Sequence, residues 1–181
     1  MESAATQPER RRIDQIREPA FVEDLDSLSL DELRARRDTA DIVETELSYY
    51  RRLLHGRMDL LAFEQRRRRG EETRSVIDAL PEILTGRDRT GSGRARHLST
   101  DLPDLPVKGK RHLDRILGND LMIRLSEMTV EELVEAATEL TEMEEEISAV
   151  RQEVQAVLDR LQSEVIARYK NDLGDPALRS S

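Results

Sequence analysis

Cysteine is absent from this 181-residue sequence, which excludes disulfides, thiolate metal sites and cysteine nucleophiles and suits a reducing cytoplasm. Tryptophan is also absent and aromatic residues make up only 3%, too few for a thick globular core. No apolar run approaches the length of a membrane span. The first 18 residues are polar and charged, unlike a signal peptide. We therefore expect a cytoplasmic protein with no membrane segment.

Charged residues are abundant instead: they make up 37% of the chain, with a formal net charge of −9. Such a composition fills a narrow seam between helices, where aliphatic side chains suffice and long charged side chains cover the outside. The negative charge argues against direct DNA or RNA binding and favours partners with basic surfaces.

Two helix starts of the same design occur in the chain. Ser29 and Glu32 have the spacing of a capping box, and Thr129 and Glu132 repeat it 100 residues later. The first helix runs without proline to a basic turn followed by Gly70, which is typical of a helix end. The repeat predicts one long helix present twice.

Each long helix has apolar residues at alternating spacings of three and four, which predicts a coiled-coil seam. The predicted seam residues are Leu33, Ala40, Val43, Leu47, Tyr50, Leu54 and Leu61 in the first helix, and Leu133, Ala136, Leu140, Met143, Ile147, Val150, Val154, Val157 and Leu161 in the second. The predicted fold is all-α: an antiparallel coiled-coil hairpin with a long flexible connector. A parallel pairing of the two helices ranks second.

The sequence divides into five segments. They are a disordered N-terminal tail (1–27), the first long helix (28–70), a connector (71–127), the second long helix (128–170) and a C-terminal tail (171–181). Within the connector, Ser75–Leu84 has the pattern of a short helix and His112–Leu125 has weaker helical periodicity. Between these two segments, residues 86–110 are rich in Gly, Pro, Ser and Arg, which predicts a flexible loop.

A polar stripe recurs on both helices with the same offset of 100 residues. Spacings of 4, 3, 4 and 4 place its five side chains within about an 80° sector beside the seam, over about 22 Å. The stripe residues are Glu44, Ser48, Arg51, His55 and Asp59 in the first helix, and Glu144, Ser148, Arg151, Gln155 and Asp159 in the second.

One stripe alone would usually be a solvated face with weak intrahelical ion pairs. A solvated face does not require Ser, Arg and Asp in the same order twice, and other exposed positions differ freely between the copies, as Arg37 and Ala137 do. Arg can read the O6 and N7 acceptors of guanine, and Asp can accept from the N1–H and N2–H donors. The duplicated stripe therefore predicts a guanine-nucleotide site.

The pattern Glu-x3-Ser-x2-Arg-x3-Gln-x3-Asp resembles the motif of the RsiG family, the cyclic-di-GMP-binding anti-sigma factors of streptomycetes. The second stripe matches the pattern in full, and the first departs only at His55. The resemblance implies an antiparallel coiled coil that binds cyclic-di-GMP through all ten residues. It also implies that the loaded protein sequesters a WhiG-like sporulation sigma factor, which we expect as a 1:1 complex with a monomer. The stripe length favours two stacked ligands per chain.

The sequence leaves two alternatives to this function. The runner-up is a ligand-independent coiled-coil adaptor or scaffold, in which the stripes are protein-docking surfaces. A metal-dependent helical-bundle enzyme is disfavoured because no histidine has the E-x-x-H or H-E-x-x-H spacing. We therefore expect a non-enzymatic protein with no catalytic residue and no metal site.

Overall fold

The computed structural model describes residues 12–85 and 124–174. All elements in these ranges are helices joined by turns, with no strand among them, so the predicted all-α class is confirmed. The described residues form two compact units, one comprising residues 12–46 and 150–174 and the other residues 47–85 and 124–149. We call them the terminal unit and the central unit.

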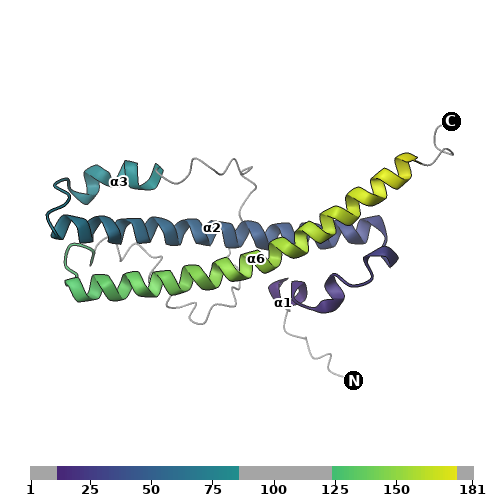
Figure 1. Cartoon of the computed structure of the whole chain (residues 1–181), viewed down its shortest axis with the longest axis horizontal. Coiled ribbons are helices and arrows are strands. Elements are labelled where there is room, and N and C mark those ends of the chain that lie inside the picture. Colours follow the sequence, from purple (N-terminus) through teal and green to yellow (C-terminus); the bar gives the residue numbers. More distant parts are fainter. Residues whose placement is uncertain (1–11, 86–123, 175–181) are drawn as a thin grey trace, which may run out of the picture. The chain divides into compact units, whose positions relative to one another are not determined.

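Two long helices dominate the described residues (Figure 1): α2, Leu30–Arg68, and α6, Val130–Gly174. The sequence predicts these helices over 28–70 and 128–170, so the starts agree to within two residues. Each helix contributes one segment to each unit. In the terminal unit these segments are 30–46 and 150–174, and in the central unit they are 47–68 and 130–149.

Both predicted capping boxes are present. The Glu32 carboxylate accepts from the backbone N–H of Ser29 at 2.8 Å, and the Glu32 N–H donates back to Ser29 Oγ at 3.3 Å. Thr129 and Glu132 make the same reciprocal pair at 2.7 and 3.1 Å. These bonds satisfy backbone donors that the first helical turn leaves without partners, which explains why both helices begin where the repeat predicts.

Gly70 ends α2 as predicted. Its φ of +78° lies in the left-handed region, and the N–H groups of Gly70 and Glu71 bond to the carbonyls of Arg67 and Arg66. This is the Schellman arrangement, for which glycine is favoured. A short helix α3, Val76–Thr85, follows, close to the predicted Ser75–Leu84.

The long helices run antiparallel in each unit, because residues with higher numbers on α2 contact residues with lower numbers on α6. In the central unit, Arg51 contacts Glu144, whereas Gln65 contacts the carbonyl of Leu133. In the terminal unit, Arg34 contacts Tyr169 and Glu44 contacts Arg151. The antiparallel pairing predicted from the seam is therefore confirmed.

The predicted seam forms the core of both units. All seven seam residues of α2 are buried, and in α6 only Ala136 and Val157 are half-buried. The buried seam residues of the terminal unit are Leu33, Ala40 and Val43 from α2 and Val150, Val154 and Leu161 from α6. Those of the central unit are Leu47, Tyr50, Leu54, Leu61, Leu133, Leu140, Met143 and Ile147.

The N-terminal segment differs from the prediction. The sequence predicts a disordered tail over 1–27, whereas residues 12–27 form α1 (Arg12–Ile16) and two 3-10 turns, η1 (Pro19–Phe21) and η2 (Leu25–Ser27). Ile13 and Ile16, one helical turn apart, are both buried. The apolar area that they bury offsets the entropy cost of ordering a polar segment.

Arg36 explains part of this order. It interrupts the seam of α2, and its Nη1 donates to the carbonyls of Ala20 and Phe21 at 2.9 and 2.8 Å. The predicted flexible loop over 86–110 lies outside the described residues, as do residues 112–123. At the other end, α6 continues to Gly174, four residues into the predicted C-terminal tail.

Candidate ligand-binding site

The polar stripes are divided between the two units. The central unit holds four residues of the first stripe and two of the second: Ser48, Arg51, His55, Asp59, Glu144 and Ser148. The terminal unit holds the other four: Glu44, Arg151, Gln155 and Asp159. Each unit thus contains residues of both motifs, one set from α2 and one from α6.

In the central unit, Glu144 is the acceptor of a small polar network. Its Oε1 lies 2.8 Å from Arg51 Nε, 2.9 Å from His55 Nε2 and 2.8 Å from the Ser148 hydroxyl. Arg51 Nε also lies 3.0 Å from Ser148 Oγ. Four motif residues on two helices therefore meet at one carboxylate oxygen, which orients the Arg51 guanidinium from its Nε side.

The electrostatics of this network favour the ionised carboxylate. Partial burial alone would raise the pKa of Glu144, but the hydrogen bonds from His55, Ser148 and Arg51 outweigh it, so the pKa lies below its ordinary value of 4.5. At neutral pH Glu144 is thus an anion that holds Arg51 in place.

In the terminal unit, the same contact recurs with the motifs exchanged. Arg151 Nε lies 2.9 Å from Glu44 Oε1, with side-chain exposures of 26% and 18%. Arg151 is the counterpart of Arg51 in the repeat, and Glu44 is the counterpart of Glu144. The arginine of each motif therefore contacts the glutamate of the other motif, from the opposite helix.

Four of the stripe residues on α6 are more buried than the other residues around them. Glu144, Ser148, Arg151 and Gln155 are half-buried, whereas the residues between them that do not belong to the seam, Glu145, Glu146, Ala149, Gln152 and Glu153, are exposed. All five stripe residues of α2 are half-buried as well. The stripes thus lie at the margin of the seam, where polar side chains are partly shielded from water and their hydrogen bonds are stronger than on an open surface.

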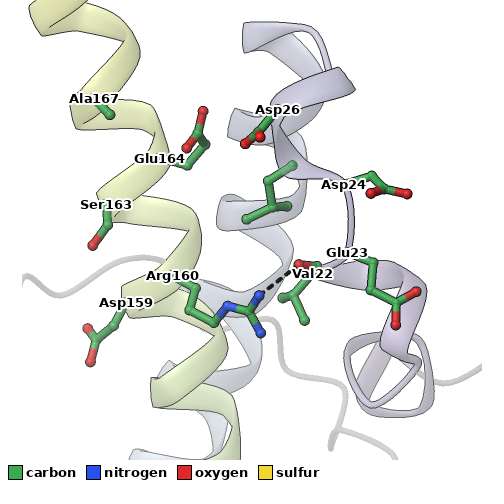
Figure 2. Close-up of a pocket in the computed structure, with 10 residues that line it drawn as sticks. Val22, Glu23, Asp24, Asp26, Asp159, Arg160, Ser163, Glu164 and Ala167 are labelled. Carbon is green, nitrogen blue, oxygen red and sulfur yellow. Dashed lines mark hydrogen bonds between the residues drawn. The ribbon is translucent and has the colours of Figure 1, made fainter.

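Asp159 is the exposed member of the stripes. It borders an open hollow in the terminal unit between α6 and residues 22–26, as Figure 2 shows. The neighbouring Arg160 reaches across from α6 and donates to the carbonyl of Val22 at 3.1 Å. The Asp159 carboxylate is therefore open to solvent at the edge of this hollow.

Two charged residues near the stripes were not predicted as part of the site. Burial raises the pKa of Glu46, partly opposed by the charge of Arg12, which pairs with it at 3.3 Å in the terminal unit. In the central unit, burial lowers the pKa of Arg57. Arg57 left a trace in the sequence because it interrupts the apolar spacing, whereas nothing in the local pattern marks Glu46.

Comparison with known proteins gives one family match. Residues 19–84 match the model of a family described as RsiG-like. This range contains η1, α2 with the entire first stripe, and nearly all of α3. No curated protein matches the chain.

RsiG-like proteins are regulatory anti-sigma factors rather than enzymes. No helix among the described residues has the length and apolar character needed to cross a membrane. The resemblance noted in the motifs is thus confirmed for the first of the two long helices, which is similar to the RsiG-like family over residues 19–84.

Proposed function

We propose that this protein is a cytoplasmic, cyclic-di-GMP-dependent anti-sigma factor that sequesters a WhiG-like sporulation sigma factor when it is loaded with the dinucleotide. The observation that supports this proposal best is the reciprocal pairing of Arg51 with Glu144 and of Arg151 with Glu44. Each glutamate orients a guanidinium at the margin of the seam, where it can meet a guanine edge or a phosphate.

The chemistry of the ligand follows from the stripe residues. The terminal nitrogens of Arg51 and Arg151 supply donors that match O6 and N7 of guanine. Asp59 and Asp159 supply acceptors for the guanine N1–H and N2–H. Each stripe carries one such Arg and Asp, and a stripe of about 22 Å accommodates two stacked ligands per chain.

The sigma factor is the partner that this family implies. Bound nucleotides add phosphate charge to a chain whose net charge is already −9, which favours docking against the basic faces that a sigma factor uses for DNA. We propose a 1:1 complex between one chain and one sigma factor, with no direct contact of this chain with DNA.

Calorimetric titration with cyclic-di-GMP and with cyclic-di-AMP tests the ligand. Adenine presents an N6 donor where guanine has O6 and lacks the N1–H and N2–H groups, so it mismatches both Arg and Asp. We expect cyclic-di-GMP to bind at least about 30-fold more tightly, because two bases each lose about 1–3 kcal/mol and every 1.4 kcal/mol is a factor of about ten. Equal affinity for both nucleotides would refute guanine recognition by the stripes.

The sigma-factor step is tested separately. By thermodynamic linkage, cyclic-di-GMP must tighten the complex with the sigma factor by the same factor as the sigma factor tightens cyclic-di-GMP. Equal sigma-factor affinity with and without the nucleotide would refute the switch.

One observation also suits the runner-up, a ligand-independent coiled-coil adaptor. The Arg–Glu pairs join the two helices directly, as polar contacts in coiled coils do when they select a partner helix. An adaptor predicts that the sigma factor, or another partner, binds equally well without nucleotide, so the same measurement separates the two functions.

A further inference from the structure

Arg68, in the last turn of α2, contacts the segment that precedes α6. Its Nη1 donates to the carbonyl of Met128 and its Nη2 to that of Leu125 at 3.1 Å. Its Nε donates at 2.8 Å to Glu64, whose side chain is 1% exposed. Two of the three guanidinium nitrogens thus connect the end of α2 to the segment before α6, and the third bonds a buried carboxylate of α2 itself, all within the central unit.

The same arrangement of contacts occurs in the terminal unit. Arg168 donates through Nε to Glu164 at 2.9 Å, through Nη2 to the Leu25 carbonyl at 2.6 Å, and through Nη1 to the Leu28 carbonyl. Every residue involved lies 100 positions from its counterpart in the central unit. The repeat therefore runs from 25 to 68 and from 125 to 168, well beyond the stripes. We call these two arrangements the Arg68 clamp and the Arg168 clamp.

The clamps add directional polar contacts, which an apolar seam lacks. Leu, Val and Ile at a regular spacing favour pairing but also permit a slip of one helix along the other, whereas directional polar contacts select one register. A slip of three or four residues displaces the helices by about 5 Å. That is enough to break the 2.8 Å contact between Arg51 and Glu144.

Each clamp shares a unit with one stripe pair. The Arg68 clamp lies about 25 Å along α2 from Arg51, and Arg51 contacts Glu144 in the same unit. The Arg168 clamp has the equivalent relation to Arg151 and Glu44 in the other unit. Both clamps are therefore placed to set the axial offset at which a stripe arginine meets its glutamate.

We propose that Arg68 and Arg168 are positioning residues for the ligand site: each sets the helix register that brings an arginine of one stripe opposite a glutamate of the other. The part of this proposal that concerns ligand affinity rests on the proposed function, and the part that concerns register does not.

Arg67 offers a matched control for Arg68. It bonds the same Glu64 carboxylate through Nε and Nη2, both at 2.8 Å. Its counterpart in the second helix is Ala167, so the Arg168 clamp forms without an arginine at this position. Arg67→Ala thus removes one cation from Glu64 and leaves the carbonyl contacts of Arg68 intact.

The absence of cysteine allows a direct measurement of register in the full chain. Arg52→Cys and Glu145→Cys, both exposed and both in the central unit, would carry one pair of spin labels. We expect Arg68→Ala to shift or broaden the label distance by about 5 Å, whereas Arg67→Ala keeps the parent distribution. Cyclic-di-GMP affinity should fall at least tenfold in Arg68→Ala and less than about twofold in Arg67→Ala.

An unchanged label distance in Arg68→Ala would overturn the proposal. An equal shift in Arg67→Ala would overturn it as well, because losing one cation beside Glu64 would then be enough to change the helix register. Should Arg68→Ala fail to fold, Arg68→Lys, which keeps the charge but lacks the fork, provides the same readout. If the parent protein binds no cyclic-di-GMP, the proposed function fails, while the label distances still decide the role of the clamp.

Discussion

Arg51 of α2 and Glu144 of α6 are joined at 2.8 Å, and their counterparts one repeat away, Arg151 and Glu44, are joined at 2.9 Å with the helices exchanged. Neither motif pairs its own arginine with its own glutamate in these contacts. This separates the stripes from a solvated helix face, where pairs form within one helix between residues three or four apart. The arginine and glutamate of each motif therefore pair across the two helices, with residues of the other motif.

Arg51→Ala should weaken cyclic-di-GMP binding at least tenfold, because it removes a charged hydrogen-bonding fork worth about 1.5–3 kcal/mol. Helix content should stay the same, since Arg51 lies beside the seam. Calorimetry and circular dichroism would measure the two effects. The neighbour Arg52 is exposed, so Arg52→Ala is the control and should bind like the parent; native affinity in Arg51→Ala would remove Arg51 from the site.

Glu144→Gln should make the free energy of unfolding decline less steeply as the pH falls into the acid range. The folded-state pKa of Glu144 lies below 4.5, so its ionised form stabilises the fold above that pH, and the contribution disappears as the pH falls below it. Urea midpoints from about pH 6 to about pH 3 would show a steeper decline for the native chain than for Glu144→Gln. Glu145→Gln controls for net charge, and matching slopes for native protein and Glu144→Gln would contradict the network.

His55→Gln gives the first stripe the residue of the second. Gln can still donate to Glu144, so we expect cyclic-di-GMP affinity to stay within a few-fold of the native value. His55→Ala removes one of the hydrogen bonds that lower the pKa of Glu144, and this pKa should rise. Carboxyl titration by NMR would detect the difference, and an identical titration in both variants would show that the 2.9 Å contact is not formed in solution.

Ser29→Ala and Thr129→Ala should each destabilise the chain by about 1 kcal/mol, within the range of 0.5–2 kcal/mol found for such caps. Each hydroxyl accepts the N–H of a glutamate three residues later. Chemical denaturation would measure the loss. Ser29→Asp, which keeps a capping acceptor, should recover most of it, whereas equal losses in Ser29→Asp and Ser29→Ala would contradict a capping role.

Leu133→Ala should lower the free energy of unfolding by about 2–5 kcal/mol, because Leu133 is 0% exposed and truncating its side chain leaves a cavity in the central unit. The adjacent Val134 is 54% exposed, so Val134→Ala should change stability by less than about 0.5 kcal/mol. Denaturant midpoints compare the pair directly. Similar losses at both positions would mean that the seam of α6 has been assigned to the wrong face.

Much of the fold could be predicted because the determinants are local. The capping boxes at Ser29 and Thr129, the stop at Gly70 and the three–four spacing of the seam each act within one or two helical turns, so a single sequence displays them. The repeat then placed the stripes on matching faces. The pattern of burial along α6 agrees with that placement.

The remaining features depend on contacts between distant residues. No periodicity within one helix reveals which residue of the other helix it faces, so the pairing of Arg51 with Glu144 became visible only in the structure. The order of residues 12–27 escaped prediction for a similar reason. Two isoleucines one turn apart are a weak local signal, and their burial is decided by tertiary packing.

The division of each long helix between two units has a consequence for how the chain folds. In the central unit, the hydrogen bonds that join α2 to α6 or to the residues before α6 span 57 to 97 positions, and in the terminal unit those that join α6 to α2 or to the N-terminal segment span 107 to 143 positions. Loop-closure entropy grows with the logarithm of this separation, by about 0.6 kcal/mol per doubling. Formation of the contacts in the central unit first is therefore favoured by roughly that amount. The contacts of the terminal unit then form after the two helices are already paired.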